Sequence, residues 1–94
     1  MNKPVFHPRR TDGNQAPIMA GLRAAGREVA DTHMVGGGFP DAIAGKLSDR
    51  SLVGLEFKMP GEVLNERELA FHIAWCGYPL FVIYTLEQAL AVTA

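Results

Sequence analysis

The chain has 94 residues, 48% of them hydrophobic and 20% charged, which suits one folded domain with a modest core. Its formal net charge of −1 excludes a generally basic surface of the kind that attracts nucleic-acid backbones. No apolar run in the sequence is long enough to cross a bilayer, so we expect a cytoplasmic protein without membrane contact. Because domains this small often gain stability by oligomerisation, a homodimer is also expected.

The first segment, residues 1–11, contains two prolines and a basic cluster but no periodic apolar pattern. It predicts an irregular, basic N-terminal arm, followed by a single domain over residues 12–94. Arg9 and Arg10 in this arm could contact a phosphate backbone, and a solvated tail is the alternative.

A helix is predicted next, starting at Asp12 or Asn14 as the N-cap and stopping at Gly26, with Pro17 in its first turn. Residues 28–32 predict a short strand. Residues 39–46 and 52–58 predict two further strands, joined by a polar turn into a hairpin.

After a break at Pro60, a second helix is expected with Asn65 as its cap, Glu68 at the capping-box position and Gly77 at its end. The apolar run within residues 78–84 predicts a central strand, covered on both faces and parallel to a neighbour. Residues 85–92 predict a closing helix capped by Thr85. The order αβββαβα gives a mixed α/β fold, a four-stranded sheet with helices packed on it.

Cysteine content excludes an internal disulfide, since Cys76 is the one cysteine of the chain. It lies beside Trp75 in an apolar segment, which predicts a packed core thiol. His72 is expected to be a partly buried packing residue.

The predicted hairpin brings charged residues together. With a two-residue tip at Ser48-Asp49, counting outward places Asp41 directly opposite Glu56, where Cβ atoms of such a pair lie about 4.5 to 5.5 Å apart. Lys58 follows Glu56 by two residues and falls on the same face, as does Gly54, which leaves space there. The other face is apolar and faces the core. A tip longer on one side only would turn Asp41 away from Glu56.

These residue types suit metal-dependent phosphodiester hydrolysis. Asp41 and Glu56, with the backbone carbonyl of Phe57, offer the hard oxygen ligands that Mg²⁺ or Mn²⁺ prefers, leaving positions for water and phosphate. Lys58 could orient the attacking water or stabilise charge on the phosphorus centre. A lone Glu-x-Lys is more often a solvated strand edge or a cross-strand ion pair. The preceding Gly36-Gly37-Gly38 and Phe39-Pro40-Asp41 add constraints that such an edge does not need.

Two segments, Gly37 to Asp41 and Leu55 to Lys58, resemble the motif of the PD-(D/E)XK nuclease superfamily, and most of all its small stand-alone VRR-NUC type from phages and prophages. The resemblance extends over nearly the whole chain, including Asp12-Gly13-Asn14, Leu22 to Gly26, Phe71-His72 with Trp75, and Leu86 to Leu90. It implies a restriction-endonuclease-like fold, a divalent-metal endonuclease acting on DNA, often as a homodimer on branched substrates such as Holliday junctions, and a bacterial or phage-infected host cell.

The chain departs from that family at two positions. Many relatives carry a carboxylate on the first helix where this sequence has Pro17, and the second-helix glutamine of the family corresponds to Glu68 here. Asn14 or Gln15 could supply the first-helix polar group, or Asn14 could be a helix cap only. Glu68 could bond the attacking water or Lys58, or complete the capping box only. His33, Gly37 and Gly38 are further candidates for DNA contact.

The alternative function is a non-catalytic DNA-binding or assembly protein that retains the nuclease fold, and a hydrolase of another phosphate ester is a third possibility. The preferred DNA structure, the cut position and the metal are left open. For the homodimer, we expect an apolar contact patch around Trp75, Tyr78 or the final helix.

Overall fold

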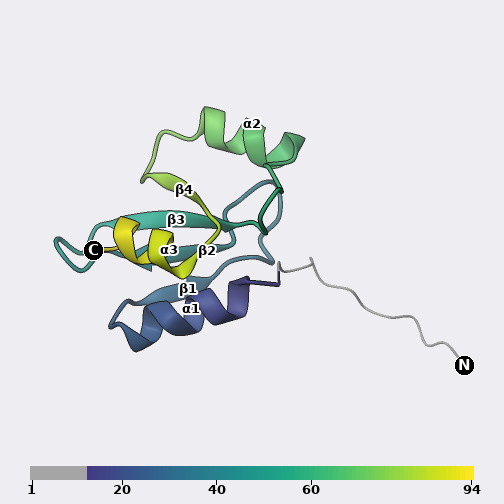
Figure 1. Ribbon diagram of the computed structural model, residues 1–94. Coiled ribbons are helices and arrows are strands. Elements are labelled where there is room, and N and C mark those ends of the chain that lie inside the picture. The colour runs from purple at the N-terminus through teal and green to yellow at the C-terminus, as the bar shows by residue number, and fades with distance from the viewer. Residues whose placement is uncertain (1–12) are drawn as a thin grey trace, which may run out of the picture.

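The computed structural model describes residues 13–94, and the predicted N-terminal arm with Arg9, Arg10 and the possible cap Asp12 lies outside them. The described chain is a mixed α/β fold with a four-stranded sheet and three helices, in the predicted order (Figure 1). The elements are α1 (Gln15–Ala24), β1 (Val29–Asp31), β2 (Ala42–Gly45), β3 (Leu52–Phe57), α2 (Glu66–Ala74), β4 (Leu80–Ile83) and α3 (Leu86–Val92).

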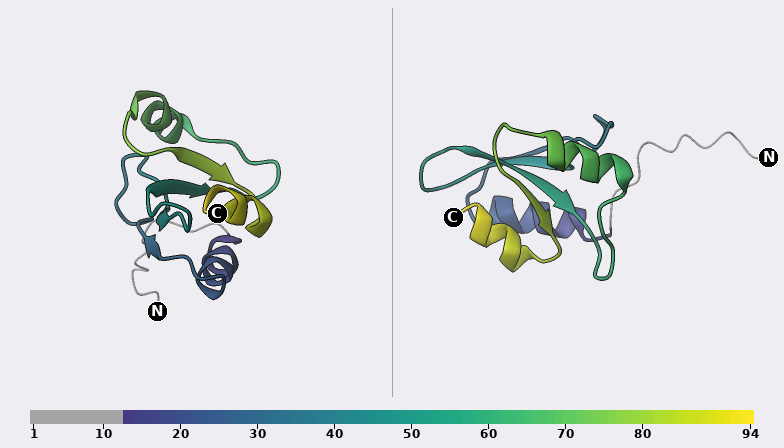
Figure 2. Two further views of the ribbon diagram at one scale, coloured as in Figure 1. Left: turned by 90° about the vertical axis from the view of Figure 1, so that its left-hand side faces the viewer. Right: turned by 90° about the horizontal axis from the view of Figure 1, so that it is seen from above.

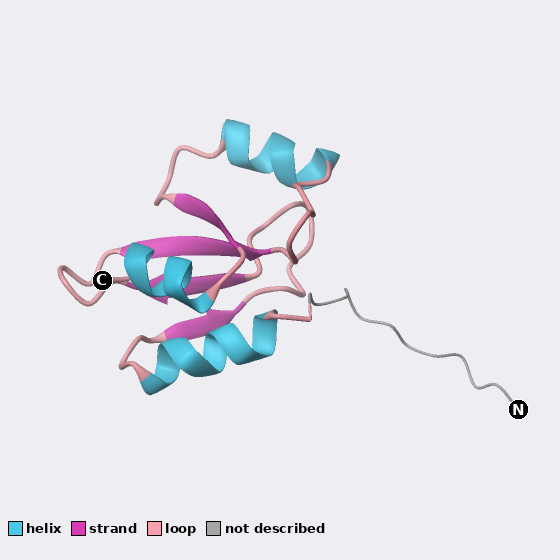
Figure 3. Cartoon of the chain, viewed as in Figure 1, coloured by secondary structure: helices cyan, strands magenta, loops and turns pink. Residues whose placement is uncertain are grey.

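The sheet has the strand order β1-β2-β3-β4, with the first three strands antiparallel and β4 parallel to β3. Helices α1 and α3 lie together on one side of the sheet, and α2 lies on the other side near β4 (Figures 2 and 3). We call these sides the core face and the α2 face. Among residues 13–94 no helix is long and apolar enough to span a membrane.

The core lies between the sheet and the two helices of the core face. Strand β3 contributes Val53, Leu55 and Phe57, each at most 1% exposed, as its alternation predicted. The helices and the other strands complete it with Ile18, Met19, Leu22, Ala42, Ala44, Ile83 and Ala89. The site residues Asp41 and Glu56 therefore sit on a sheet that is anchored from behind.

Helix α1 stops at the predicted glycine. Gly26 adopts a φ of +89°, and the Arg27 and Gly26 N–H groups donate to Leu22 O and Arg23 O, the paired bonds of a Schellman ending. The helix begins with Asn14 at the N-cap position, one of the two predicted caps, although the Asn14 side chain makes no cap bond. The Asn14 amide is used elsewhere, as the site geometry shows.

The β2–β3 hairpin has a four-residue loop, Leu47 to Arg50, and the predicted two-residue tip is wrong. Lys46 N–H donates to Ser51 O across its base, and Arg50 takes the left-handed conformation with a φ of +65°. The loop gains one residue on each side, so the parity of the pairing is unchanged. Ala42 pairs with Leu55 as the predicted count requires.

Strand β2 is shorter than the predicted 39–46, because Pro40 has no N–H to donate to a ladder. Strand β4 is parallel to its neighbour, as predicted, but lies at the edge of the sheet and not at its centre. Its apolar run reflects contacts on both faces, since Leu80 reaches Gly54 and Phe81 packs on the core.

Helix α2 begins at Asn65 with the predicted capping box: Asn65 Oδ1 accepts from Glu68 N–H at 2.8 Å, and Glu68 Oε1 accepts from Asn65 N–H at 2.9 Å. It ends at Ala74, ahead of the predicted Gly77. Cys76 is exposed, so the predicted core thiol is wrong. Helix α3 carries the predicted Thr85 cap, in a capping box with Gln88.

Rings hold α2 against the strand ends. Phe71 and Trp75 stack at 5.1 Å between ring centroids, and Phe39 and Tyr78 meet them edge-on at 5.5 and 5.2 Å. Trp75 and Tyr78 are therefore half-buried within the monomer, and Leu86, Leu90 and Val92 of the last helix pack on the core. The apolar contact patch expected around these residues stays a prediction.

Candidate active site

The pairing of β2 with β3, extended by one residue beyond Ala42 and Leu55, sets Asp41 opposite Glu56. In this ladder Lys46 and Ser51 form a hydrogen-bonded pair. Alternation then makes Asp41 and Glu56 a pair without ladder bonds, the kind in which side chains stand closest, with Cα atoms about 4.5 Å apart. The two carboxyl groups interact directly, and each affects the pKa of the other.

Asp41 is fixed by a hydrogen bond to the backbone of β3, since its Oδ2 accepts the Phe57 N–H at 2.8 Å. The next ladder position pairs Pro40 with Phe57, and the Pro40 carbonyl, the ordinary ladder acceptor of this N–H, accepts the Thr32 hydroxyl at 2.7 Å. The N–H and C=O of one strand residue point to the same side, so the Phe57 carbonyl also points to the β2 side, where Pro40 has no N–H to donate to it. This geometry suits the predicted role of the Phe57 carbonyl as a metal ligand.

Glu56 is a buried carboxyl group, only 3% exposed. Its Oε1 is buried and has no hydrogen-bond partner among the described residues. Burial, followed by the neighbouring charge of Asp41, raises the pKa of Glu56 to about 10. Burial also raises the pKa of Asp41, against the bond from Phe57 N–H. Such a carboxyl pair keeps a proton near neutral pH unless a cation replaces it.

Lys58 forms an ion pair with Glu68, with 2.8 Å between Nζ and Oε1, and both side chains are largely buried. The same Glu68 oxygen accepts the Asn65 N–H of the capping box. Although burial opposes its charge, these two donors hold the pKa of Glu68 below its ordinary value. Glu68 therefore fulfils both predicted roles that involve the protein, the cap and the bond to Lys58.

The first-helix candidates lie at the end of β3. The Asn14 amide donates to Lys58 O at 2.9 Å and to Tyr84 O at 3.1 Å, tying the start of α1 to the ends of β3 and β4. Its Oδ1 is buried and has no hydrogen-bond partner among residues 13–94. Gln15 is 3% exposed, and its Nε2 donates to Met19 Sδ at 3.7 Å. Asn14 supports the backbone of Lys58. Pro17, which stands where many members of the resembled family carry a carboxylate, is exposed.

Other predicted site residues have structural roles. Gly38 is buried, with a φ of +86°, and a Cβ there would lie 2.4 Å from Arg67 O, so it permits close packing of α2. Gly37 is exposed with nothing within 4 Å of a Cβ position. His33 pairs with Asp31 at the end of β1. The open space predicted at Gly54 is absent, because side-chain atoms of Leu80, Pro40 and Tyr78 fill the position of a Cβ there.

His72 has a buried Nε2 without a hydrogen-bond partner among the described residues, and burial lowers its pKa, which agrees with the predicted packing role. Sequence reasoning missed the part played by Pro40, whose missing N–H leaves the Phe57 carbonyl without its ladder donor. The signal was present as a proline directly before a strand aspartate.

The donor set can be tested against a divalent metal ion. Within residues 13–94 no group of three or more His, Cys, Asp or Glu side chains is arranged to hold a metal. Asp41 and Glu56 could supply two carboxylate ligands, the Phe57 carbonyl a third, and water and phosphate the rest, as is usual for Mg²⁺. The unpartnered Glu56 oxygen fits this role, because a cation would satisfy it and relieve the repulsion between the two carboxylates.

Comparison with known proteins adds no relative: no family model, no curated protein and no solved structure matches this chain.

Proposed function

We propose that this chain is a Mg²⁺- or Mn²⁺-dependent DNA endonuclease of the PD-(D/E)XK superfamily, close to its VRR-NUC type, with a restriction-endonuclease-like fold. Branched DNA such as a Holliday junction is the proposed substrate. The observation that carries the proposal is the Asp41–Glu56 pair opposed at the ends of β2 and β3, with Asp41 partly buried and Glu56 buried. Glu56 has an oxygen without a hydrogen-bond partner among the described residues, and Lys58 lies two residues beyond it. The resemblance of the surrounding motif supports DNA as the substrate.

Each residue has a distinct part in this proposal. A bound divalent metal would lower the pKa of a water molecule and offset charge developing on the phosphodiester. Asp41 and Glu56, ionised in that state, would hold the metal together with the Phe57 carbonyl. The Lys58 ammonium group would donate a hydrogen bond from Nζ to the attacking water or to a phosphate oxygen. Glu68 would hold Lys58 in place by pairing with its ammonium group, and the Asn14 amide would do so by donating to the backbone carbonyl of Lys58.

The test is cleavage of labelled four-way junction, flap and linear duplex DNA in Mg²⁺, Mn²⁺ or EDTA. Lys58→Met keeps the length of the buried stem and removes the charge, and we expect it to reduce metal-dependent cutting at least about a hundredfold, as loss of one charge-stabilising donor does. Lys46→Ala is the matched control, a lysine just beyond the other end of β2, and should cut like wild type. Equal cutting by wild type and Lys58→Met would refute the assigned site.

A non-catalytic DNA-binding protein is the second candidate. It is favoured by the two departures from the family, since Pro17 offers no ligand and Glu68 is already engaged by Asn65 N–H and Lys58. Binding of the junction with no cutting under any metal condition, in wild type and in Lys58→Met alike, would favour this reading over the nuclease.

A further inference from the structure

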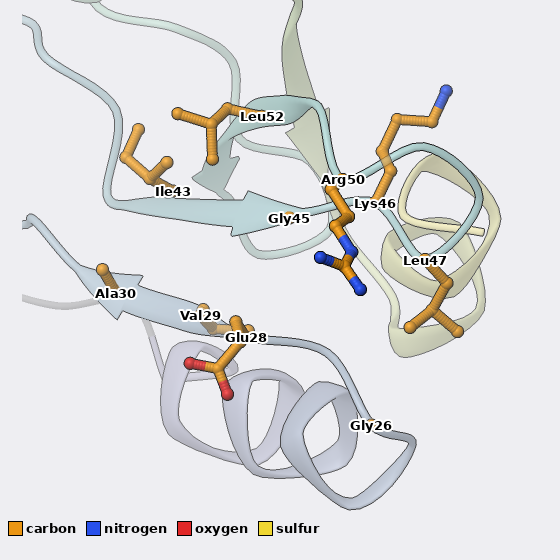
Figure 4. Close-up of a pocket in the computed structure, with 10 residues that line it drawn as sticks. All are labelled: Gly26, Glu28, Val29, Ala30, Ile43, Gly45, Lys46, Leu47, Arg50 and Leu52. Atoms are coloured by element: carbon orange, nitrogen blue, oxygen red, sulfur yellow. The ribbon is translucent and has the colours of Figure 1, made fainter.

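The α2 face of the sheet is covered at one end only. At the active-site end, Arg67 of α2 closes on Gly38, and Pro40, Tyr78 and Leu80 fill the space over Gly54. Toward the hairpin, the same face holds a pocket of about 710 Å³ (Figure 4). Its lining residues are Gly26, Glu28, Val29, Ala30, Ile43, Gly45, Lys46, Leu47, Arg50 and Leu52.

The floor of this pocket is a continuous strip across three strands. Ala30 pairs with Ile43, and Gly45, two residues after Ile43, pairs with Leu52, so the side chains of Ala30, Ile43 and Leu52 share the α2 face. Figure 4 shows Ile43 and Leu52 next to each other on neighbouring strands. Leu52 is 46% exposed and Leu47, in the hairpin loop, is 53% exposed. A sheet face with apolar residues in this state is typical of one that packs against another surface.

Charges of opposite sign flank the strip. Glu28 precedes β1 on one side and Arg50 stands in the hairpin loop on the other, both exposed. In Figure 4 the Arg50 guanidinium extends into the space toward Glu28, while Lys46 extends away. The ion pairs within residues 13–94 are His33–Asp31 and Lys58–Glu68, so neither Glu28 nor Arg50 forms one there.

We propose that this strip, defined by Ala30, Ile43 and Leu52 with Glu28 and Arg50 at its sides, is the contact surface of a two-fold homodimer. A two-fold axis brings the same patch of both chains together, so the patch must complement itself. An apolar centre with an acid on one side and a base on the other does so, because Glu28 of each chain meets Arg50 of its partner. Two such sheets would stack face to face about 10 Å apart.

This arrangement does not place the partner chain over the carboxylate sites, because Asp41 and Glu56 lie at the α2 end of the same face, away from the strip. The inference concerns association only, and it holds whether or not the chain cuts DNA. Sedimentation and native mass spectrometry without metal or DNA therefore test it separately from the proposed function.

Exchange of the two charges gives the sharpest experiment. Glu28→Arg alone sets two arginines against each other at both symmetric contacts, and Arg50→Glu alone sets two glutamates against each other. We expect each variant to dimerise at least about tenfold more weakly than wild type. An equimolar mixture of the two should regain the dimer as a mixed species, since each arginine then meets a glutamate of the other chain. An effect within one chain cannot be rescued by mixing.

The apolar centre has a matched control. Leu52→Glu places a charge in the strip, whereas Leu69→Glu places one on α2 at a residue of similar exposure, 49% against 46%. Both variants should fold, which circular dichroism checks, and only Leu52→Glu should become monomeric. A monomeric wild type, an unrescued mixture of the charge variants, or a dimer lost in Leu69→Glu and kept in Leu52→Glu would each overturn the proposal.

Discussion

Replacing Glu56 by glutamine tests whether the buried carboxyl pair governs the stability of the metal-free protein. Burial and the charge of Asp41 raise the pKa of Glu56 from its ordinary value of 4.5 to about 10. Between these values the folded protein holds a proton on Glu56 that the unfolded chain has released. Unfolding then releases a proton, so the free energy of unfolding falls as the pH rises.

The size of the effect follows from one proton. The free energy of unfolding should fall by about 1.4 kcal/mol per pH unit, which is about 2 kcal/mol between about pH 7.5 and pH 9. His72, whose pKa is lowered by burial, does not disturb this window because it is neutral in both states. Glutamine has nearly the same shape and no proton to lose. The Glu56→Gln variant should therefore show a much flatter dependence and exceed wild type in stability at the upper pH.

Urea unfolding in EDTA, followed by circular dichroism at several pH values, measures both slopes. A second arm adds Mg²⁺ or Mn²⁺, which should stabilise wild type by about 2.7 kcal/mol at a hundred times its dissociation constant and Glu56→Gln much less. Parallel pH dependences in the two proteins, or a wild type that gains stability toward pH 9, would refute the reasoning about the buried pair.

Two further changes address the support around the site. Glu68→Gln keeps an oxygen for the Asn65 cap but replaces the ion pair with Lys58 by a hydrogen bond between the ammonium group and a neutral amide. We expect a loss of stability of about 1 kcal/mol and cleavage reduced roughly tenfold, with unchanged cleavage counting against a positioning role for Glu68. Gly38→Ala should destabilise the fold by about 2 kcal/mol or more, because a Cβ would lie 2.4 Å from Arg67 O at a φ of +86°. Gly37→Ala, at a φ of +67° with nothing within 4 Å, should cost only about 1 kcal/mol, and equal losses in the two variants would show that packing against α2 is not the cause.

The sequence by itself determined the features that depend on neighbours along the chain. The capping box at Asn65, the Thr85 cap and the glycine stop at Gly26 could be read directly, because each depends on residues within one turn. The opposition of Asp41 and Glu56 was also predictable. It depends only on the parity of the pairing, which the longer loop preserved by growing equally on both sides.

Only the tertiary structure decided what covers each surface. An apolar run predicts burial but not its position, so β4 was expected at the centre of the sheet and lies at its edge, and Cys76 was expected in the core and is exposed. The bond of Asn14 to Lys58 O joins residues 44 apart in the chain, and that of Asn14 to Tyr84 O joins residues 70 apart. Local periodicity carries no information about such contacts, because they arise from how helices dock on the sheet after each element has formed.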